Sequence, residues 1–505
     1  MLLLDGNSLR WQDVVAVARG NGTAALHPDA RTRMLASRKI VEDHVAAGDV
    51  VYGVTTGFGK FAQIAIPLEH RAELQRNLVR SHAAGVGDSF PTDVVRAMLL
   101  LRANALAKGA SGVRPVLVDT LLEVLNKRVH PIIPSVGSLG ASGDLAPLAH
   151  LALVLIGEGE AELMGRRISG GDALREAGIQ PLALEAKEGL ALLNGTQAMT
   201  AMAALLCEDG GRLCALADVC GALSIDATLS SRAPCEEALH LLRPYPGALA
   251  TARNIRTLLE DSEILASHAH CKRVQDPYSL RCIPQVHGAA RDALTHAEEM
   301  LAIEINAATD NPLVLSDGRV LSGGNFHGQP IAIRLDYLAL ALHELGSISE
   351  RRVDWIMNPN LTDLPAFLAP VEGLHSGYMI AQYTSAALVT ENKTLCGPAS
   401  ASSIPVSGNQ EDHNSMGMTS ALHARSILEN VRTILAIEIL CAAQAIHLRK
   451  ALSGRGLQPL IQILRKDVPP LTEDRVVSTD IENVRKLIVS GALLSAAEGA
   501  IGQLA

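Results

Sequence analysis

The sequence predicts a mainly α-helical protein that is built around a bundle of long helices. Several long segments place apolar side chains at steps of three and four residues, which is the period of a helix. Aromatic residues make up only 3% of a 505-residue chain that is 48% hydrophobic. Small and aliphatic side chains must therefore form the core, which favours close packing between helices. Strand signals are few and short.

Four segments carry the helical pattern: 94–128, 287–308, 331–356 and 420–449. The first should form two helices, because Gly112 and Pro115 interrupt it. The second should end before Asn311-Pro312, since a residue that precedes proline disfavours the helical conformation. The last would be about 45 Å long at ~1.5 Å per residue.

Two short β patches and one uncharged stretch complete the pattern. We expect strands near 160–170 and in 312–322, where Asp317-Gly318 is a hairpin signal. Residues 189–207 lack charge, but their polar side chains predict a buried or site-lining helix rather than a membrane span. We expect an N-terminal region, 1–200, followed by a central helix bundle and C-terminal helical region, 201–505.

Composition argues against several classes of partner. The chain has 44 Lys and Arg against 53 Asp and Glu, without a basic run, so neither a nucleic acid nor a membrane is expected. Its eight cysteines form no C-x-x-C pair and predict reduced thiols in the cytoplasm. The N-terminus lacks the pattern of a signal peptide. Metal binding at 268–271, "HAHC", is conceivable, but no second ligand pair lies nearby, and no metal site is expected.

Polar clusters between the helices suggest a functional site. Residues 52–60, "YGVTTGFGK", form a glycine-rich loop that could approach a ligand or be a plain turn. Residues 275–281, "QDPYSLR", offer an amide, a phenol and a guanidinium, or a surface turn around a proline. Residues 409–413, "NQEDH", suit a solvated loop before a helix when taken alone.

The most unusual segment is 137–150, "GSLGASGDLAPLAH", in which three glycines allow a tight bend around Ala141-Ser142-Gly143. A serine hydrolase would need a histidine paired with Ser142, and His150 is the only candidate nearby. No other standard hydrolase motif is present.

This segment resembles the signature of the aromatic amino acid ammonia-lyase family. Further family motifs follow in order: "YGVTTGFG", "NLVRSHAAGVG", "LLNGTQ", "VQDPYSLRC", "TDNPLV", "GGNFHG", "ENKTL" and "NQEDHNSMG". In the family, the nitrogen of Gly143 would attack the carbonyl carbon of Ala141. Loss of one water from the ring and a second from Ser142 would then give 4-methylidene-imidazol-5-one (MIO), an electrophile that serves as the cofactor without any external one. Asp144 could help to move protons during this closure.

The resemblance implies a role for each matching residue. Tyr278 would be the catalytic base, Tyr52 would assist proton transfer, and Arg281 would hold the substrate carboxylate. Asn194 and Gln275 would hydrogen-bond to the substrate or MIO, and Phe326 would pack beside MIO. The family fold is a long central helix bundle of the fumarase/aspartase-like type, with a mixed N-terminal region that carries MIO. The family is usually a homotetramer with shared active sites, so Tyr52 and Tyr278 could come from different chains.

Ser81-His82 and Glu411 favour an imidazole-bearing substrate within this family. His82 and Glu411 can bond ring nitrogens, and Glu411 could also move protons, whereas a phenyl ring would need an apolar wall. The expected reaction converts L-histidine to trans-urocanate and ammonia. The alternatives are a tyrosine or phenylalanine ammonia-lyase, an MIO-dependent aminomutase and a non-catalytic helical scaffold. Arg80, Asn414 and Cys396-Gly397 depart from the family pattern.

Overall fold

The computed structural model describes the whole chain except residues 21, 52, 55, 58–63, 65 and 270–272. The described residues are mainly helical, so the predicted fold class is confirmed. The chain divides into two compact units. Unit 1 contains Met1–Glu208, Ala297–Asp336 and Pro398–Leu422, and unit 2 contains Asp209–His296, Tyr337–Gly397 and His423–Ala505.

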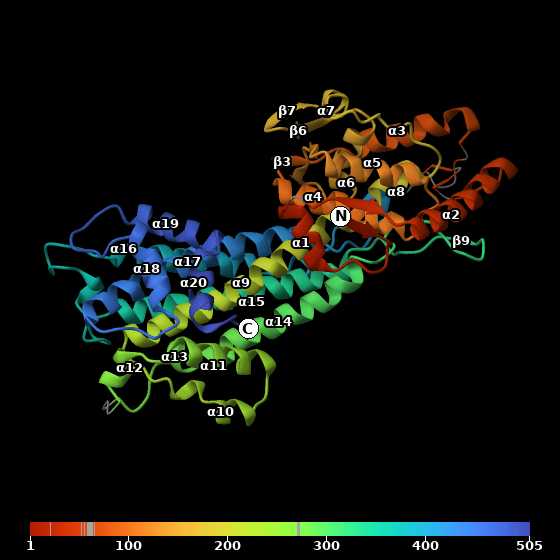
Figure 1. The fold of residues 1–505 in the computed structure, drawn as a ribbon. Coiled ribbons are helices and arrows are strands. Elements are labelled where there is room, and N and C mark those ends of the chain that lie inside the picture. The colour runs from red at the N-terminus through yellow and green to blue at the C-terminus, as the bar shows by residue number, and fades with distance from the viewer. Residues whose placement is uncertain (21, 52, 55, 58–63, 65, 270–272) are drawn as a thin grey trace. The chain divides into compact units, whose positions relative to one another are not determined.

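Unit 1 combines helices with small sheets (Figure 1). Its helices are α1 (Trp11–Arg19), α2 (Pro28–Ala47), α3 (Arg71–His82), α4 (Thr92–Ala107), α5 (Pro115–Asn126), α6 (Leu145–Leu155), α7 (Gly170–Glu176) and α8 (Glu188–Leu193). Its strands are β1 (Leu2–Leu4), β2 (Ala24–Leu26), β3 (Val86–Ser89), β4 (His130–Pro131), β5 (Pro134–Val136), β6 (Glu160–Leu163), β7 (Arg166–Ser169), β8 (Leu313–Val314) and β9 (Val320–Leu321). β1 and β2 pair in parallel, and the sheets β3-β5, β4-β6-β7 and β8-β9 are antiparallel.

Local sequence signals placed several elements of unit 1 correctly. The segment 94–128 is interrupted as expected: α4 ends at Ala107, and α5 begins at Pro115. The expected β patches are the β6–β7 and β8–β9 hairpins. The uncharged stretch 189–207 is buried, but it forms α8 and the start of α9 rather than one helix, because the chain turns at Asn194.

Four long helices have residues in both units: α9 (Gln197–Ala227), α14 (Ile283–Glu304), α15 (Gln329–Met357) and α17 (Gly417–Arg449). The three helices expected from 287–308, 331–356 and 420–449 are thus confirmed as α14, α15 and α17. Because the chain passes between the units along these helices, each unit contains three segments. The expected division into the regions 1–200 and 201–505 stays a prediction.

Unit 2 contains the rest of the long helices and eight shorter ones. The shorter helices are α10 (Glu237–Leu241), α11 (Pro246–Leu258), α12 (Glu263–Ser267), α13 (Tyr278–Arg281), α16 (Met379–Leu395), α18 (Gln458–Asp467), α19 (Val477–Val489) and α20 (Ala492–Ile501). By length and composition alone, α17 could cross a membrane, but 78% of its most apolar window is buried inside the protein. That burial is typical of a core helix.

A buried ion pair joins the long helices inside unit 2. The guanidinium of Arg352, on α15, bonds the carboxylate of Glu438, on α17, with an Nη2–Oε2 distance of 2.8 Å, and neither side chain is exposed. Ser224, on α9, donates to the same carboxylate at 2.6 Å, and Ser349 also donates to it. This carboxylate is thus the polar junction of α9, α15 and α17.

We expect Glu438→Leu to destabilise the protein strongly, because it leaves the Arg352 guanidinium buried without its carboxylate. Loss of one partner from a buried pair costs about 3–5 kcal/mol. The melting temperature, followed by circular dichroism, should therefore fall by several degrees. The double variant Arg352→Met/Glu438→Leu should recover most of the loss. A double variant no more stable than Glu438→Leu would contradict this account.

Candidate active site

The loop that carries Ala141-Ser142-Gly143 lies between β5 and α6. Gly140 and Gly143 both have positive φ, +66° and +76°, so the tight bend expected from the glycines is present. Ala141 and Gly143 are buried, and Ser142 is half-buried. Ser142 is thus the residue of this triplet whose side chain is partly exposed.

The backbone of this loop lies directly against the junction between α8 and α9. Gly143 and Gly195 form a parallel bridge, and the Asp144 N–H donates to the Gly195 carbonyl at 2.7 Å. A Cβ atom on Gly143 would overlap that carbonyl group. The two chain segments can approach this closely only because Gly143 has no side chain.

The carboxylate of Asp144 fixes the end of the loop. Its Oδ2 accepts from the backbone N–H groups of Ala198 and Met199, both at 2.9 Å, and its Oδ1 accepts from Ser138 Oγ at 2.8 Å. The two N–H groups are at the start of α9, where a negative charge is favourable. Burial raises the pKa of Asp144 to about 6, although these hydrogen bonds oppose the shift.

Two later segments of the chain hold the other side of the loop. The Gly140 carbonyl accepts from Ser415 Oγ at 3.0 Å and from the Gly328 N–H at 3.1 Å. The Met416 N–H donates to the Leu139 carbonyl at 2.8 Å. The motifs "GGNFHG" and "NQEDHNSMG" therefore meet at this loop.

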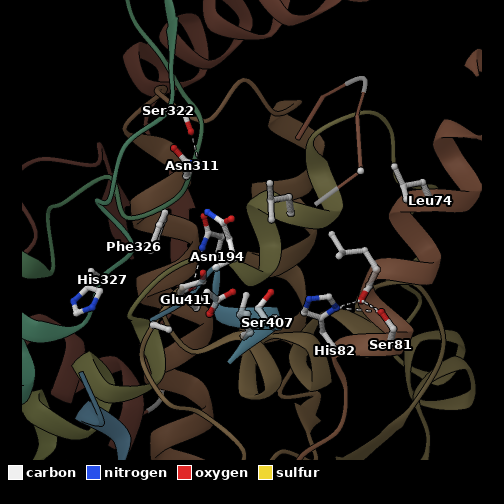
Figure 2. A pocket seen from close by; sticks show the side chains of 18 of the residues that line it. Leu74, Ser81, His82, Asn194, Asn311, Ser322, Phe326, His327, Ser407 and Glu411 are labelled. Carbon is white, nitrogen blue, oxygen red and sulfur yellow. Dashed lines mark hydrogen bonds between the residues drawn. The ribbon is translucent and has the colours of Figure 1, made fainter. Parts of the chain in front are cut away.

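A cavity of about 1100 Å³ opens over Ala141 and Ser142 (Figure 2). Of the residues predicted to form the site, the cavity lining includes Ala141, Ser142, His82, Asn194, Phe326 and Glu411. Apolar side chains cover part of its wall: Ile64, Ile66, Leu74, Leu78, Leu145 and Leu190. The cavity thus combines an apolar wall with a few polar groups, as small-molecule sites do.

Asn194 binds the Ser142 backbone directly. Its Nδ2 donates to the Ser142 carbonyl at 2.7 Å. The side chain is buried at the end of α8, so few other orientations are open to it. This hydrogen bond would favour negative charge on the Ser142 oxygen.

His82 presents a neutral imidazole to the cavity. At the end of α3, its Nδ1 lies 2.9 Å from the Leu78 carbonyl and 3.1 Å from Ser81 Oγ. Burial lowers the pKa of His82, so the ring is neutral at pH 7. Because a carbonyl only accepts, Nδ1 carries the proton, and Nε2 is left as an acceptor.

Glu411 is the acidic group beside Ser142. Its backbone pairs with that of Val406, with N–O distances of 3.0 and 3.3 Å, and this pairing closes the loop between them. Burial raises the pKa of Glu411, while a hydrogen bond with Ser142 lowers it in part. The carboxyl group is therefore in hydrogen-bonding contact with the residue expected to supply the electrophile.

The other predicted residues are not part of this cavity lining. Gln275, Tyr278 and Arg281 belong to unit 2, and Tyr52 lies outside the described residues. Tyr278 is 70% exposed, and the Arg281 guanidinium lies 4.8 Å from the centre of its ring. Arg281 Nη1 also donates to Gln275 Oε1.

Three hydrogen bonds position the segment that carries Tyr278. The Asp276 carboxylate accepts from the Ser231 N–H at 2.7 Å and from Arg273 at 3.2 Å. Arg352, paired with Glu438, donates to the Ser279 carbonyl at 3.5 Å. The ion pair of unit 2 is therefore bonded to α13.

The positions that depart from the family pattern have local structural roles. Arg80 forms two hydrogen bonds of 2.8 Å with Glu158. Asn414 is buried, donates to the Ile404 carbonyl, and is not among the residues that line the cavity. The Cys396 thiol contacts the Ala339 carbonyl in unit 2.

Sequence reasoning missed the residues that support the loop from beneath, above all Arg102. Its guanidinium is fully buried and bonds the α8–α9 junction. A signal was available, because Arg102 follows three leucines within a largely apolar helix, where a charge needs a specific partner.

The contact between Gly143 and Gly195 can be tested with matched glycine substitutions. Gly143→Ala should lower the melting temperature more than Gly165→Ala. Both positions have nearly equal positive φ, +76° and +74°, so the backbone strain caused by alanine should be the same in both variants, about 1–2 kcal/mol. Only at Gly143 does the new Cβ overlap backbone atoms, whereas nothing lies within 4 Å at Gly165. Equal losses would contradict the close approach.

Comparison with known proteins agrees with the motifs. The family model for aromatic amino acid lyases matches residues 9–466. A histidine ammonia-lyase of Gloeobacter violaceus is 53% identical, with 100% of this chain and 98% of that relative covered. A crystal structure of histidine ammonia-lyase from Trypanosoma cruzi is 42% identical, with a TM-score of 0.91 and coverage of 99% and 95%.

A tyrosine aminomutase from Streptomyces globisporus is also similar in structure. It is 40% identical, has a TM-score of 0.94, and covers both chains completely. These matches extend over the full chain and confirm the resemblance found from the motifs. The chain belongs to the aromatic amino acid lyase family.

Proposed function

We propose that this protein converts L-histidine to trans-urocanate and ammonia. The observation that carries the proposal is that His82 and Glu411 line the same cavity as Ser142. Relatives about half identical over the full chain are histidine ammonia-lyases, including one from Anaeromyxobacter sp. that is 55% identical. We further propose that the enzyme works in the cytoplasm, consistent with free thiols at all seven described cysteines.

Residues 141–143 fit the MIO group implied by the family. They are small, Ala141 and Ser142 line the cavity, and the position of Gly143 leaves no room for a Cβ. Asn194 Nδ2 would hold the oxygen contributed by Ser142. No standard side chain is a good electrophile. The group would supply one, and either the amine or the ring of the substrate would bond to it.

His82 and Glu411 would select the ring of the substrate. The Nε2 of His82 and the carboxyl oxygens of Glu411 can accept hydrogen bonds, which suits the N–H groups of an imidazole ring. A phenyl ring would leave both half-buried acceptors without donors, and a phenol ring, with its single O–H, would leave one of them without a donor. Such unpaired groups allow strong discrimination between substrates. Phe326 and the aliphatic wall would pack against the ring faces and exclude water.

The remaining roles fall to residues outside the cavity lining of unit 1. Tyr278 would remove the β-proton through its phenol oxygen, with Tyr52 assisting, while Arg281 would pair with the substrate carboxylate through two hydrogen bonds. Gln275 would bond the substrate. We propose that other subunits of a homotetramer supply some of these groups, which accords with the exposure of Tyr278 and of apolar side chains such as Ile380 and Tyr383 on α16.

A second candidate is an aminomutase, because the tyrosine aminomutase structure superimposes over the full chain. Such an enzyme would return ammonia to the β-carbon and release a β-amino acid. Product analysis separates the two reactions, since only the lyase accumulates the unsaturated acid.

Incubation of the purified protein with L-histidine should produce the near-ultraviolet absorbance of urocanate. L-tyrosine and L-phenylalanine should give no comparable band, because their rings cannot satisfy His82 and Glu411. Ser142→Ala should reduce the histidine reaction to background, and its intact mass should equal the mass calculated for the unmodified variant chain, whereas the parent protein should be lighter than its unmodified chain by two waters. A coumarate or cinnamate band in place of urocanate would contradict the substrate assignment.

The pH dependence of kcat/KM should follow the carboxyl group of Glu411. Because burial raises its pKa, kcat/KM should fall with decreasing pH while the medium is still above the ordinary glutamate range. Glu411→Gln should lower kcat/KM about 10- to 100-fold, the equivalent of one hydrogen bond to a charged group, and should flatten this acidic limb. The exposed Glu69→Gln variant is the control and should keep the limb. If kcat/KM of Glu411→Gln still decreased at acidic pH as in the parent protein, this decrease would belong to another group.

A further inference from the structure

Arg102 is a buried charge that no step of the proposed reaction uses. It lies on α4, where every residue from Val94 to Ala107 is buried. The carboxylate of Asp310 attracts it, but Asp310 already bonds Lys187 at 2.7 Å and Ser111 at 3.0 Å. Burial lowers the pKa of Arg102 to about 10, so the guanidinium remains charged at neutral pH. A buried charge without its own carboxylate is costly and calls for a specific role.

The guanidinium closes the end of α8. Nη1 donates to the Asn194 carbonyl at 3.0 Å, and Nη2 donates to the Ala191 carbonyl. These carbonyl groups end the helix and have no helical partners, and a cation is favourable at this end of the helix dipole. Arg102 thus determines where α8 stops.

The same guanidinium holds the start of α9. Nη1 also donates to Gln197 Oε1 at 2.7 Å, and Gln197 Nε2 in turn donates to Thr309 Oγ1 at 2.8 Å. A Cβ on Gly195 would overlap the guanidinium, so Arg102 fills the space beneath the bend. One planar side chain therefore bonds both sides of the bend at 194–196.

The bend supplies three contacts to the loop of Ala141-Ser142-Gly143. Asn194 Nδ2 bonds the Ser142 carbonyl, the Gly195 carbonyl accepts from Asp144, and the first turn of α9 bonds the Asp144 carboxylate. We infer that Arg102 is a positioning residue that fixes this bend, and through it the geometry of residues 141–144. This inference rests on the proposed function where it concerns the reaction, and on contacts alone where it concerns the bend.

Arg96 provides a matched control on the same helix. It is also a buried arginine whose guanidinium bonds backbone carbonyl groups, here those of Val17, Ala18 and Leu125, whereas Arg102 bonds the Gln197 side chain as well. Neither the loop nor the α8–α9 junction is among its partners. Arg102→Lys and Arg96→Lys therefore remove the same chemistry from the same helix at two different places.

The test compares these variants by amide hydrogen exchange and intact mass. Arg102→Lys should speed exchange at Asp144, Ala198 and Met199 by at least about tenfold, because one ammonium cannot bond both helix ends. Arg96→Lys should leave these amides unchanged. In Arg102→Lys, a larger share of the molecules should keep the two waters that MIO formation removes. This variant should also lower kcat more than it raises KM.

Each outcome decides the inference. Equal exchange at these amides in both variants, or no change in Arg102→Lys, would overturn it. If Arg102→Lys does not fold, Gln197→Met is the milder variant; it should speed the same exchange, and no effect there would overturn the inference. If the parent protein loses no water and forms no urocanate, the proposed function fails, but the exchange data still decide the role of Arg102.

Discussion

The contact between the backbones of Gly143 and Gly195 is the constraint on which the rest of unit 1 depends. It is a meeting of two chain segments without side chains, so it supplies little hydrophobic energy of its own. Its geometry must be imposed by the helices on either side. The carboxylate of Asp144 binds the N-terminus of α9, and the guanidinium of Arg102 binds the C-terminus of α8. Each charge lies at the helix end whose dipole favours it.

This arrangement explains why charged groups lie in an otherwise aliphatic interior. Burial of Asp144 and Arg102 costs free energy, and both pKa values shift toward the neutral form as a result. In unit 2, the buried charges of Arg352 and Glu438 stabilise each other by pairing directly. Asp144 and Arg102 bond mainly backbone groups, together with the side chains of Ser138 and Gln197, and so fix the path of the chain.

The cavity above this contact has a distinctive electrostatic character. Burial raises the pKa of Glu411 and lowers that of His82, so both groups are driven toward their uncharged forms. A ligand that brings N–H donors would offset the cost for the carboxylate and occupy the free nitrogen of the histidine. An apolar ring would do neither. The selectivity proposed for this site thus follows from desolvation more than from shape.

The sequence by itself determined the local features of this protein. The period of apolar residues and the breaks at proline and glycine placed α4, α5, α14, α15 and α17, and turn residues placed the β6–β7 and β8–β9 hairpins, because these depend on neighbours within a few positions. The motifs also indicated the family. The local pattern did not show that α8 and α9 are separate helices, because Arg102, on α4, bonds the turn between them.

Only the tertiary structure decided which distant residues meet. It brought His82, Asn194, Phe326 and Glu411 to the cavity over Ser142, while Tyr278 and Arg281 fell in the other unit. It also gave Arg102 its partners. The physical reason is that spacing along a chain encodes helices and turns, whereas contacts between segments depend on how whole helices pack, and no local pattern records that packing.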